Sequence, residues 1–433
     1  SEKAGILPGD RIVSINDSVV AGMGIAQTDI VKRLRGMKGS VVKLGIRRST
    51  SKKPLTFEVT RGDIPLNSVD AAYMISPETG YIKVNKFGRT TYDEFLTALA
   101  RLTASGAGSF IVDLRGNGGG FLEMAIMMAN EFLPIDSPIV ETRGRHESEN
   151  SAIASDGNGS FQNAGLVVLL DEYSASASEI FAGAMQDNDR ALIVGRRSFG
   201  KGLVQRQITL PDSSAVRLTV QRYYTPSGRC IQKDYRLGER GAYEQDITKR
   251  YEHGEFFASD SIHLNKEVEY HTIGGRKVYG GGGIMPDVFV PNDTVGISSY
   301  YINVLNAGLL QKFAFQYTDR RRETLSKAAN LSELLRMLPS DEELLQQFVS
   351  YASSNGVPAR WYYINISHRL IVNYLKALIA SDTLGRETYY QVANTDDTTV
   401  QRALRELTEG RATAPITAGT DSLGVHPVRQ GGK

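Results

Sequence analysis

Apolar and polar positions divide the chain into three stretches of different periodicity. Up to about residue 63, short runs alternate apolar and polar residues as half-buried strands do, and Pro8-Gly9-Asp10 marks a turn. From about residue 70, apolar strands alternate with segments of helical period, which predicts an α/β domain. Beyond about residue 298 the apolar residues recur at helical spacing, which predicts a mostly helical C-terminal region.

In the first two stretches the pattern predicts strands at 11–15, 41–47, 55–60, 81–87, 110–114, 166–170, 191–195, 203–210 and 216–224, and helices at 29–35, 91–103, 122–132 and 178–186. In the third stretch it predicts helices at 300–316, 331–338, 342–353 and 364–379. Residues 412–433 are rich in Gly, Pro, Thr and Arg with little apolar content, which is typical of a disordered tail.

Length and charge narrow the class of protein. A chain of 433 residues exceeds what one hydrophobic core organises, so two or three domains are expected. The apolar fraction of 41% is that of a water-soluble protein, and no run approaches the roughly 18 apolar residues of a membrane helix. The 50 basic and 48 acidic residues nearly cancel, so nucleic acid is not an expected partner. Because the sequence opens on Ser1 without a signal-peptide pattern, we interpret it as a fragment or a processed form.

Cysteine and histidine offer little chemistry. The single cysteine, Cys230, excludes an intrachain disulfide and forms no recognisable metal site. The six histidines lie in polar, charged or helical surroundings rather than at a strand end or a glycine-rich turn. The pattern therefore points to no histidine base, although proximity in space stays open.

A candidate nucleophile lies where the strand at 166–170 runs through Ser174-Ala175-Ser176-Ala177-Ser178 into a helix. Free N–H groups at a helix start point toward such a turn, so a hydroxyl there has an oxyanion-binding site beside it. The structural alternative is that Ser176 and Glu179 only form a capping box, Ser-x-x-Glu, that holds the helix start. The segment alone leaves both interpretations open.

A serine hydroxyl needs a base, and Lys201 is the best candidate because it lies between two glycines directly after a buried strand. A lysine becomes a base only if its pKa falls from about 10.4 toward neutrality. A fall of roughly three units corresponds to about 4 kcal/mol, which desolvation can supply. We therefore expect Lys201 to be buried and without a carboxylate partner. The alternative, a phosphate-binding loop, lacks the flanking residues of a P-loop.

Four motifs occur in a fixed order: Asp113-Leu114-Arg115-Gly116-Asn117-Gly118-Gly119-Gly120, Ser174-Ala175-Ser176-Ala177-Ser178-Glu179-Ile180, Phe199-Gly200-Lys201-Gly202-Leu203-Val204-Gln205 and Tyr223-Tyr224-Thr225-Pro226-Ser227-Gly228. Together they resemble the carboxyl-terminal processing (tail-specific) peptidase family, over residues 1 to about 292. Ala4-Gly5-Ile6, Pro8-Gly9-Asp10 and Ile12-Val13-Ser14-Ile15-Asn16 resemble the PDZ domain fused to such proteases. In that domain the peptide-binding strand and carboxylate loop precede the Ala-Gly-Ile segment, so we expect a truncated module.

The resemblance implies a serine–lysine dyad, with Ser176 as nucleophile and Lys201 as general base, and such a mechanism requires no metal and no organic cofactor. It also implies that Gln205, four residues after Lys201, orients the amine by a hydrogen bond. The period of a β-strand would place Lys201 and Gln205 on one face, as this role requires.

The oxyanion hole would use the backbone N–H of Ala177 and one N–H of the loop Gly118-Gly119-Gly120, and the sequence does not decide which of the three glycines donates. Asp113 and Arg115 are expected to hold this loop as a charged pair. Ser174 and Ser178 are then expected to be turn and cap residues.

The apolar pattern predicts an α/β fold, and the resemblance implies a ClpP/crotonase-like peptidase core. The expected domains are a truncated PDZ module at 1–63, the core at 64–297, a helical region at 298–411 and a tail at 412–433. The predicted function is that of a serine endopeptidase acting on polypeptides, including ones with exposed C-termini, with adaptor binding and oligomerisation left open. A catalytically silent scaffold and a non-peptide serine hydrolase are the alternatives, and the resemblance implies a periplasmic or cell-envelope location.

Overall fold

The computed structural model describes residues 4–7, 9–48, 51–64, 66–234, 241, 243, 245–263 and 268–412. The chain divides into two compact units, and each unit combines two segments. One unit comprises Asn67–Asp293 with the described part of Asn394–Lys433, and the other the described part of Ser1–Leu66 with Thr294–Ala393. Helices long and apolar enough for a membrane span are absent from the described residues. The predicted disordered tail, apart from Ala412, lies outside them.

The N-terminal segment is a small antiparallel sheet of order β2-β1-β3-β4. Its elements are β1 (Arg11–Ile15), β2 (Ser18–Val19), α1 (Gln27–Leu34), β3 (Val41–Arg47) and β4 (Leu55–Thr60). Val42, Leu44 and Ile46 alternate with more exposed residues along β3 and fill the core beneath it. The strands predicted at 11–15, 41–47 and 55–60 are confirmed with the same bounds.

The larger unit is built on a six-stranded sheet of order β16-β11-β10-β7-β6-β5. Its strands are β5 (Val69–Ser76), β6 (Thr79–Val84), β7 (Ser109–Asp113), β10 (Gly165–Leu170), β11 (Leu192–Gly195) and β16 (Val288–Phe289). All neighbouring strands are parallel except β5 and β6. Strand β10 is buried along its whole length, which explains why its sequence is an unbroken apolar run.

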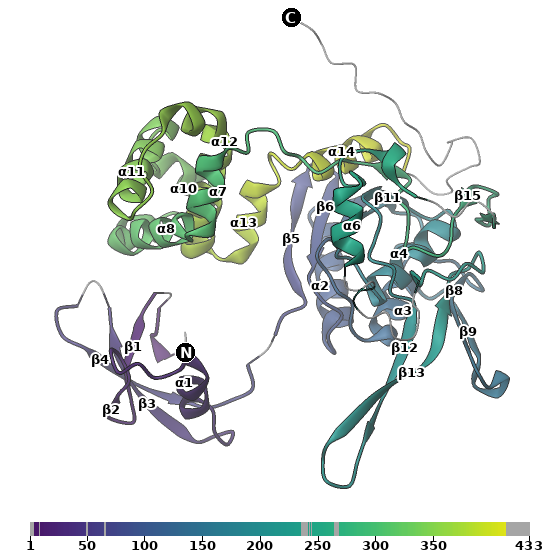
Figure 1. Cartoon of the computed structure of the whole chain (residues 1–433), viewed down its shortest axis with the longest axis horizontal. Helices are drawn as coiled ribbons and strands as arrows, with labels where there is room; N and C mark the ends of the chain where they lie inside the picture. Colours follow the sequence, from purple (N-terminus) through teal and green to yellow (C-terminus); the bar gives the residue numbers. More distant parts are fainter. Residues whose placement is uncertain are drawn as a thin grey trace, which may run out of the picture. The chain divides into compact units, whose positions relative to one another are not determined.

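Helices cover both faces of this sheet (Figure 1). They are α2 (Thr91–Ala104), α3 (Leu122–Asn130), α4 (Ala177–Asp187) and α14 (Thr398–Thr408). Leu166 and Val168 of β10 join one apolar cluster with residues of α2, α3 and α4, whereas Gly165 lies against Leu407 of α14. Because successive strand residues face opposite sides, α14 covers the second face of the sheet. The sequence predicted a single helical region at 298–411. It did not predict that α14, the last helix of that region, packs on the sheet and completes the core of the larger unit.

A second, antiparallel sheet of order β12-β13-β8-β9 lies beside the core. It consists of β8 (Pro138–Gly144), β9 (Ser151–Ala154), β12 (Leu203–Thr209) and β13 (Ala215–Tyr224). Strands β12 and β13 form the long hairpin that projects from the unit in Figure 1. The remaining short elements are 3-10 turns at Glu147–Glu149 and Ser259–Ser261, α6 (Asp246–Glu252), β14 (Tyr270–His271) and β15 (Lys277–Val278).

Residues 294–393 form a helical bundle with its own apolar core. Its helices are α7 (Ser299–Asn306), α8 (Leu309–Arg320), α9 (Arg322–Leu325), α10 (Leu331–Met337), α11 (Asp341–Ser354), α12 (Trp361–Leu384) and α13 (Arg386–Ala393). The single helix predicted at 300–316 is wrong, because Gly308 adopts a left-handed conformation, with φ of 63°, between α7 and α8. The other three predicted helices are confirmed within a few residues, except that α12 is longer at both ends.

Candidate active site

Three of the sequence motifs meet because they follow three neighbouring parallel strands. The glycine-rich loop follows β7, the serine turn follows β10 and the lysine loop follows β11, and β10 lies between the other two strands. The carboxyl ends of parallel strands share one edge of the sheet, where α/β proteins place their sites. The topology therefore brings together segments that are far apart in the sequence.

Ser176 is the N-cap of α4 and has an unusual backbone conformation, with φ of 58° and ψ of −114°. Such a conformation costs a residue other than glycine about 1–3 kcal/mol, and strain of this kind clusters at functional sites. The side chain is half-buried between the small, buried residues Ala175 and Ala177. The N–H of Ala177, the first of the helix, donates to no acceptor within the described residues, so it is available to a ligand.

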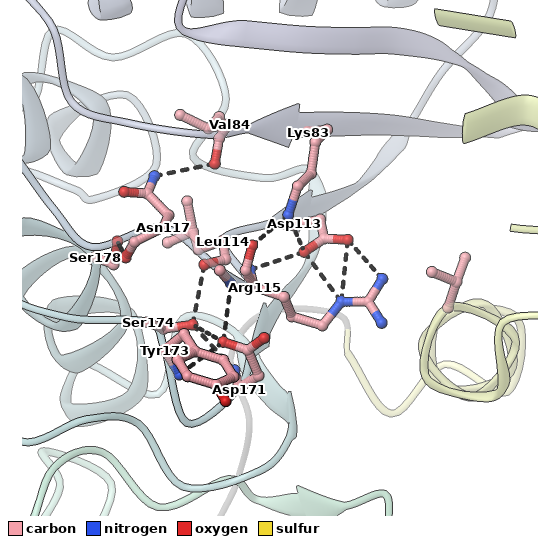
Figure 2. A network of polar contacts seen from close by, with 12 residues as sticks. Lys83, Val84, Asp113, Leu114, Arg115, Asn117, Asp171, Tyr173, Ser174 and Ser178 are labelled. Atoms are coloured by element: carbon pink, nitrogen blue, oxygen red, sulfur yellow. Dashed lines mark hydrogen bonds and ion pairs between the residues drawn. The ribbon is translucent and has the colours of Figure 1, made fainter. Parts of the chain in front are cut away.

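The glycine-rich loop is fastened to the serine turn on both sides of Ser176. The carbonyl oxygen of Asn117 accepts hydrogen bonds from the Ala175 N–H at 3.0 Å and from the Ser178 hydroxyl at 2.8 Å. Figure 2 shows how the buried Asn117 reaches the opposite way, where its amide donates to the carbonyl oxygen of Val84 at 3.0 Å. Asn117 therefore fixes the loop relative to the candidate nucleophile.

Asp171 and Ser174 make further connections between the same two segments (Figure 2). The Ser174 hydroxyl donates to the carbonyl oxygen of Leu114 at 2.9 Å, and the Asp171 carboxylate accepts the Gly116 N–H at 2.9 Å. The turn role predicted for Ser174 is confirmed, because its N–H donates to the Asp171 carbonyl oxygen at 3.0 Å. The cap role predicted for Ser178 is wrong, because Ser176 is the N-cap of α4 and the Ser178 hydroxyl bonds to the glycine-rich loop.

The position of Gly119 admits no side chain. Its φ is 98°, and a Cβ atom there would lie 2.8 Å from the Cβ of Ser176 and 3.0 Å from the Ala177 nitrogen. The Gly119 N–H is already bonded to the Asn117 side chain at 2.9 Å. The N–H of Gly120, in contrast, donates to no acceptor among the described residues.

Asp113 is the centre of a buried ionic network behind the loop. Its carboxylate pairs with Arg115 at 2.6 Å and Lys83 at 3.1 Å (Figure 2). It also accepts the Tyr81 hydroxyl at 2.7 Å. Burial alone would raise the pKa of Asp113, but the two cations and the hydrogen bonds hold it below its ordinary value. The ionised Asp113 network therefore stabilises the folded state at any pH above the ordinary pKa of a carboxyl group. This contribution is lost only as the pH falls through the lowered pKa of Asp113. The predicted Asp113–Arg115 pair is confirmed.

The same arginine connects the loop to the C-terminal helix. The Nη1 atom of Arg115 lies within hydrogen-bond distance of both carboxylate oxygens of Asp397, at 3.1 and 2.9 Å. Asp397 is also the N-cap of α14, since its carboxylate accepts the N–H groups of Thr399 at 2.9 Å and Val400 at 3.0 Å. Nothing in the local sequence around Asp397 indicates a partner 282 positions away.

We predict that Asp397→Ala destabilises the folded chain more than Asp397→Asn does. Alanine removes both the cap and the ion pair, for a loss of about 2 kcal/mol, whereas asparagine keeps the cap and loses about half of that. Urea unfolding of the two variants and the wild type measures the difference. Equal stability of all three would show that the pair does not contribute to holding α14.

Glu179 joins the serine turn to the lysine loop. It is fully buried, and one carboxylate oxygen accepts the Ser198 hydroxyl at 2.5 Å and the Gly200 N–H at 2.7 Å. The other oxygen accepts the N–H of Ser176 and the N–H of Lys201, both at 2.8 Å. The two backbone nitrogens are therefore at most twice that distance apart.

The Glu179 half of the capping box foreseen from Ser176 and Glu179 is present, because the carboxylate accepts the Ser176 N–H, but the same carboxylate also holds the lysine loop. Burial raises the pKa of Glu179 above its ordinary value, and the hydrogen bonds from Ser198 and the three N–H groups oppose this rise. Since all four partners donate, they favour the ionised carboxylate.

We predict that Glu179→Gln loosens the site as well as the fold. The amide NH₂ of glutamine would face N–H groups, which leaves donors unsatisfied and costs about 3 kcal/mol. We expect a lower kcat with a smaller change in KM, together with earlier urea unfolding. The exposed Glu123 of α3 provides the matched control, because Glu123→Gln should behave as wild type. A Glu179→Gln variant with unchanged kcat and stability would show that the Glu179 carboxylate does not hold the serine turn and the lysine loop together.

Lys201 was expected to be buried and to have no carboxylate partner. Among the described residues its ammonium group has neither a hydrogen bond nor an ion pair, in agreement with the second expectation. The side chain is half-buried rather than buried, because it lines an open cavity of about 1020 Å³. Within the described chain no hydrogen bond joins the Lys201 amine to the Ser176 hydroxyl.

Gln205 lines the same cavity as Lys201 but is exposed, and it makes no hydrogen bond to that amine in the described chain. The strand begins only at Leu203, and its pairing with β13 shifts between Val204 and Gln205. The simple strand period from Lys201 to Gln205 is therefore interrupted, although both side chains reach one cavity.

Sequence reasoning missed the residues that hold the lysine loop from its other side. Lys233 donates its N–H to the Gly200 carbonyl oxygen at 3.0 Å, and the Gln232 side chain accepts the Gly202 N–H at 2.9 Å. Burial lowers the pKa of Lys233, whose ammonium lies 3.9 Å from the centre of the Phe199 ring. These residues follow the Tyr-Thr-Pro-Ser-Gly motif, which was the available signal.

The fourth motif is a turn anchored on the end of α4. Ser227 donates its N–H and its hydroxyl to Asp187 at 3.1 and 2.7 Å, and Arg229 pairs with the same carboxylate at 2.7 Å.

As for metals, the described residues contain no group of three or more His, Cys, Asp or Glu side chains that could hold an ion.

Comparison with known proteins assigns the region that carries these motifs. Residues 78–239 match the model of peptidase family S41, and residues 1–48 match a PDZ domain. The chain contains a peptidase family S41 domain. Residues 300–385, which lie between the S41 domain and α14, match a family of unknown function, DUF8443. The predicted family and fold class, an α/β peptidase core with a PDZ module and a helical C-terminal region, are confirmed.

Relatives of the S41 domain are named as processing proteases. The "Carboxyl-terminal-processing protease" of Synechocystis sp. is 38% identical over 54% of this chain and 54% of that protein. The "Carboxy-terminal-processing protease" of Bartonella bacilliformis is 33% identical over 67% of this chain and 65% of that protein. The "Probable CtpA-like serine protease" of Staphylococcus haemolyticus is 35% identical over 53% and 45%. The chain thus spans about half to two-thirds of the length of these relatives.

Among solved structures, the "Photosystem II D1 C-terminal processing protease" is similar, with 31% identity and a TM-score of 0.34. That similarity covers 53% of this chain and 62% of the other.

Proposed function

We propose that this chain is a serine endopeptidase that hydrolyses peptide bonds in polypeptides through a dyad of Ser176 and Lys201. The observation that supports it best is the single carboxylate oxygen of Glu179, which accepts the backbone N–H groups of both residues at 2.8 Å. The unpaired amine of Lys201 and the strained, half-buried Ser176 are consistent with a base and a nucleophile.

In the proposed reaction the Lys201 amine accepts the hydroxyl proton of Ser176 as the serine oxygen attacks the peptide carbonyl carbon. The C–N bond of the tetrahedral intermediate then breaks, and the lysine ammonium gives the proton to the leaving amine. Water attacks the resulting ester in a second round of the same proton transfers, and the acid product leaves. Gln205 would orient the amine once substrate closes the cavity.

The developing oxyanion needs two N–H donors. Ala177 supplies one, since its N–H is free at the start of α4. Between Gly119 and Gly120, Gly120 is favoured, because the N–H of Gly119 is already bonded to Asn117. Gly119 then serves by its lack of a side chain, which lets the loop lie against Ser176.

The test is a comparison of peptide and ester turnover by the wild-type chain. An unfolded polypeptide and an ester matched to one of its cleavage sites are incubated with the protein, and the products are identified by mass spectrometry. Endoproteolytic fragments of the polypeptide are expected. Hydrolysis of the ester alone would indicate a non-peptide hydrolase, and turnover of neither would indicate a binding protein.

A periplasmic or cell-envelope location remains part of the proposal and rests on the resemblance alone.

A further inference from the structure

The cavity that contains Lys201 and Gln205 is strongly basic. Besides Lys201 its lining includes Arg143, Arg145 and Arg222, and no aspartate or glutamate is among the described residues that line it. Of the three arginines, only Arg143 has a carboxylate partner in the described chain, since it bonds to Glu141 at 2.7 and 2.6 Å. Arg145 and Arg222 are exposed and have no ion-pair partner among the described residues.

The placement of these arginines brings like charges close together, which does not favour the folded state. Arg222 of β13 and Arg143 of β8 are direct partners in the antiparallel register. Like charges opposite each other on neighbouring strands destabilise a sheet. Arg145 follows one residue beyond the end of β8 and adds a third guanidinium to the same cavity. Glu141 already compensates the charge of Arg143, so Arg222 and Arg145 are the two guanidinium groups that remain for a carboxylate from outside the chain.

The rest of the lining fits an extended peptide. Tyr224, which lies 4.4 Å beneath the Arg143 guanidinium, contributes an aromatic face, and Leu203 and Phe199 add apolar surface. Arginine binds carboxylates through two parallel hydrogen bonds, so the free guanidinium groups are suited to an acidic side chain.

We propose that this cavity is a substrate subsite for an aspartate or glutamate side chain of the polypeptide, with Arg222 and Arg145 as the residues that determine specificity. The inference rests on the proposed function and names its substrate class. Lys201 lines the subsite and its backbone shares the Glu179 carboxylate with Ser176, so the acidic residue lies close to the bond that is cleaved.

The test is peptide binding to the Ser176→Ala variant, which blocks turnover, measured by fluorescence anisotropy. One apolar sequence carries a glutamate at successive positions, each peptide is matched with its glutamine counterpart, and all are amidated at the C-terminus. We expect the best glutamate peptide to bind about tenfold more tightly than its counterpart at low salt, with a smaller ratio at high salt. Arg222→Gln and Arg145→Gln should each reduce the ratio, and Arg222→Glu should favour a lysine peptide.

The matched control is Arg206→Gln, because Arg206 is an exposed arginine of the same hairpin that does not line the cavity. This control should keep the full preference for glutamate. A third peptide series, without glutamate but with a free C-terminus, distinguishes a terminal carboxylate from a side chain.

Equal binding of glutamate and glutamine peptides at every position would overturn the inference, and so would a preference only for the free C-terminus. Binding is measured without turnover, so the subsite is decided even if the wild-type chain cleaves nothing. Failure of the proposed function and failure of the subsite are thus separate results.

Discussion

Ser176→Ala is expected to reduce kcat/KM for peptide cleavage on the order of 10⁴-fold or more, because the variant lacks the atom that forms the acyl-enzyme. The fold should be retained, since the bonds to Glu179 and Asn117 that hold this turn come from backbone groups and from Ser178 rather than from the Ser176 hydroxyl. Steady-state cleavage of a fluorogenic peptide measures the loss, and urea unfolding checks the fold.

Ser178→Ala is the control for that experiment, because Ser178 lies in the same turn and also carries a hydroxyl. Its hydroxyl bonds to the Asn117 carbonyl oxygen, so its removal should cost less than about tenfold in rate. The assignment of Ser176 would have to be abandoned if the alanine variant cleaved at the wild-type rate, or if only the Ser178 variant were inactive.

Lys201→Met should reduce kcat/KM for peptide cleavage as much as Ser176→Ala does. Methionine fills the space of the methylene chain of the lysine but cannot accept a proton. A serine without a base is a weak nucleophile at neutral pH. Residues that act as a unit are strongly non-additive, so the double variant should be no slower than either single variant. The amine makes no hydrogen bond within the described residues, so stability should change little.

The rates of all four proteins on one peptide provide the measurement. Additive losses in the double variant would indicate that the two side chains act independently. Full activity of Lys201→Met would remove the lysine from the mechanism and would require another base within reach of Ser176.

The parts of the fold that the sequence predicted best are those with one dominant signal. Strands β7, β10 and β11 are short apolar runs buried on both faces, and each is followed by small or polar residues that mark the turn. Strand β8 was missed because it begins at a proline and carries Glu141 and Arg143. Two consecutive residues of the strand, Ile139 and Val140, are both buried, so its sequence shows no simple alternation of apolar and polar positions.

In the site, local motifs identified the segments but not the contacts between them. Glu179 was interpreted only as a cap for Ser176, because a capping box joins residues only three positions apart. Its bonds to Gly200 and Lys201 depend on the pairing of β10 with β11, which no local pattern encodes. The same holds for Asp397, whose pairing with Arg115 requires that α14 return to the sheet after a hundred residues of helical bundle.

Covalent labelling with a fluorophosphonate tests most directly whether the turn before α4 carries an activated serine. After labelling, digestion and tandem mass spectrometry locate the adduct among Ser174, Ser176 and Ser178. We predict that the adduct lies on Ser176 in the wild-type chain and is lost in Lys201→Met. An adduct on another serine, or undiminished labelling of Ser176 without the lysine, would contradict the account.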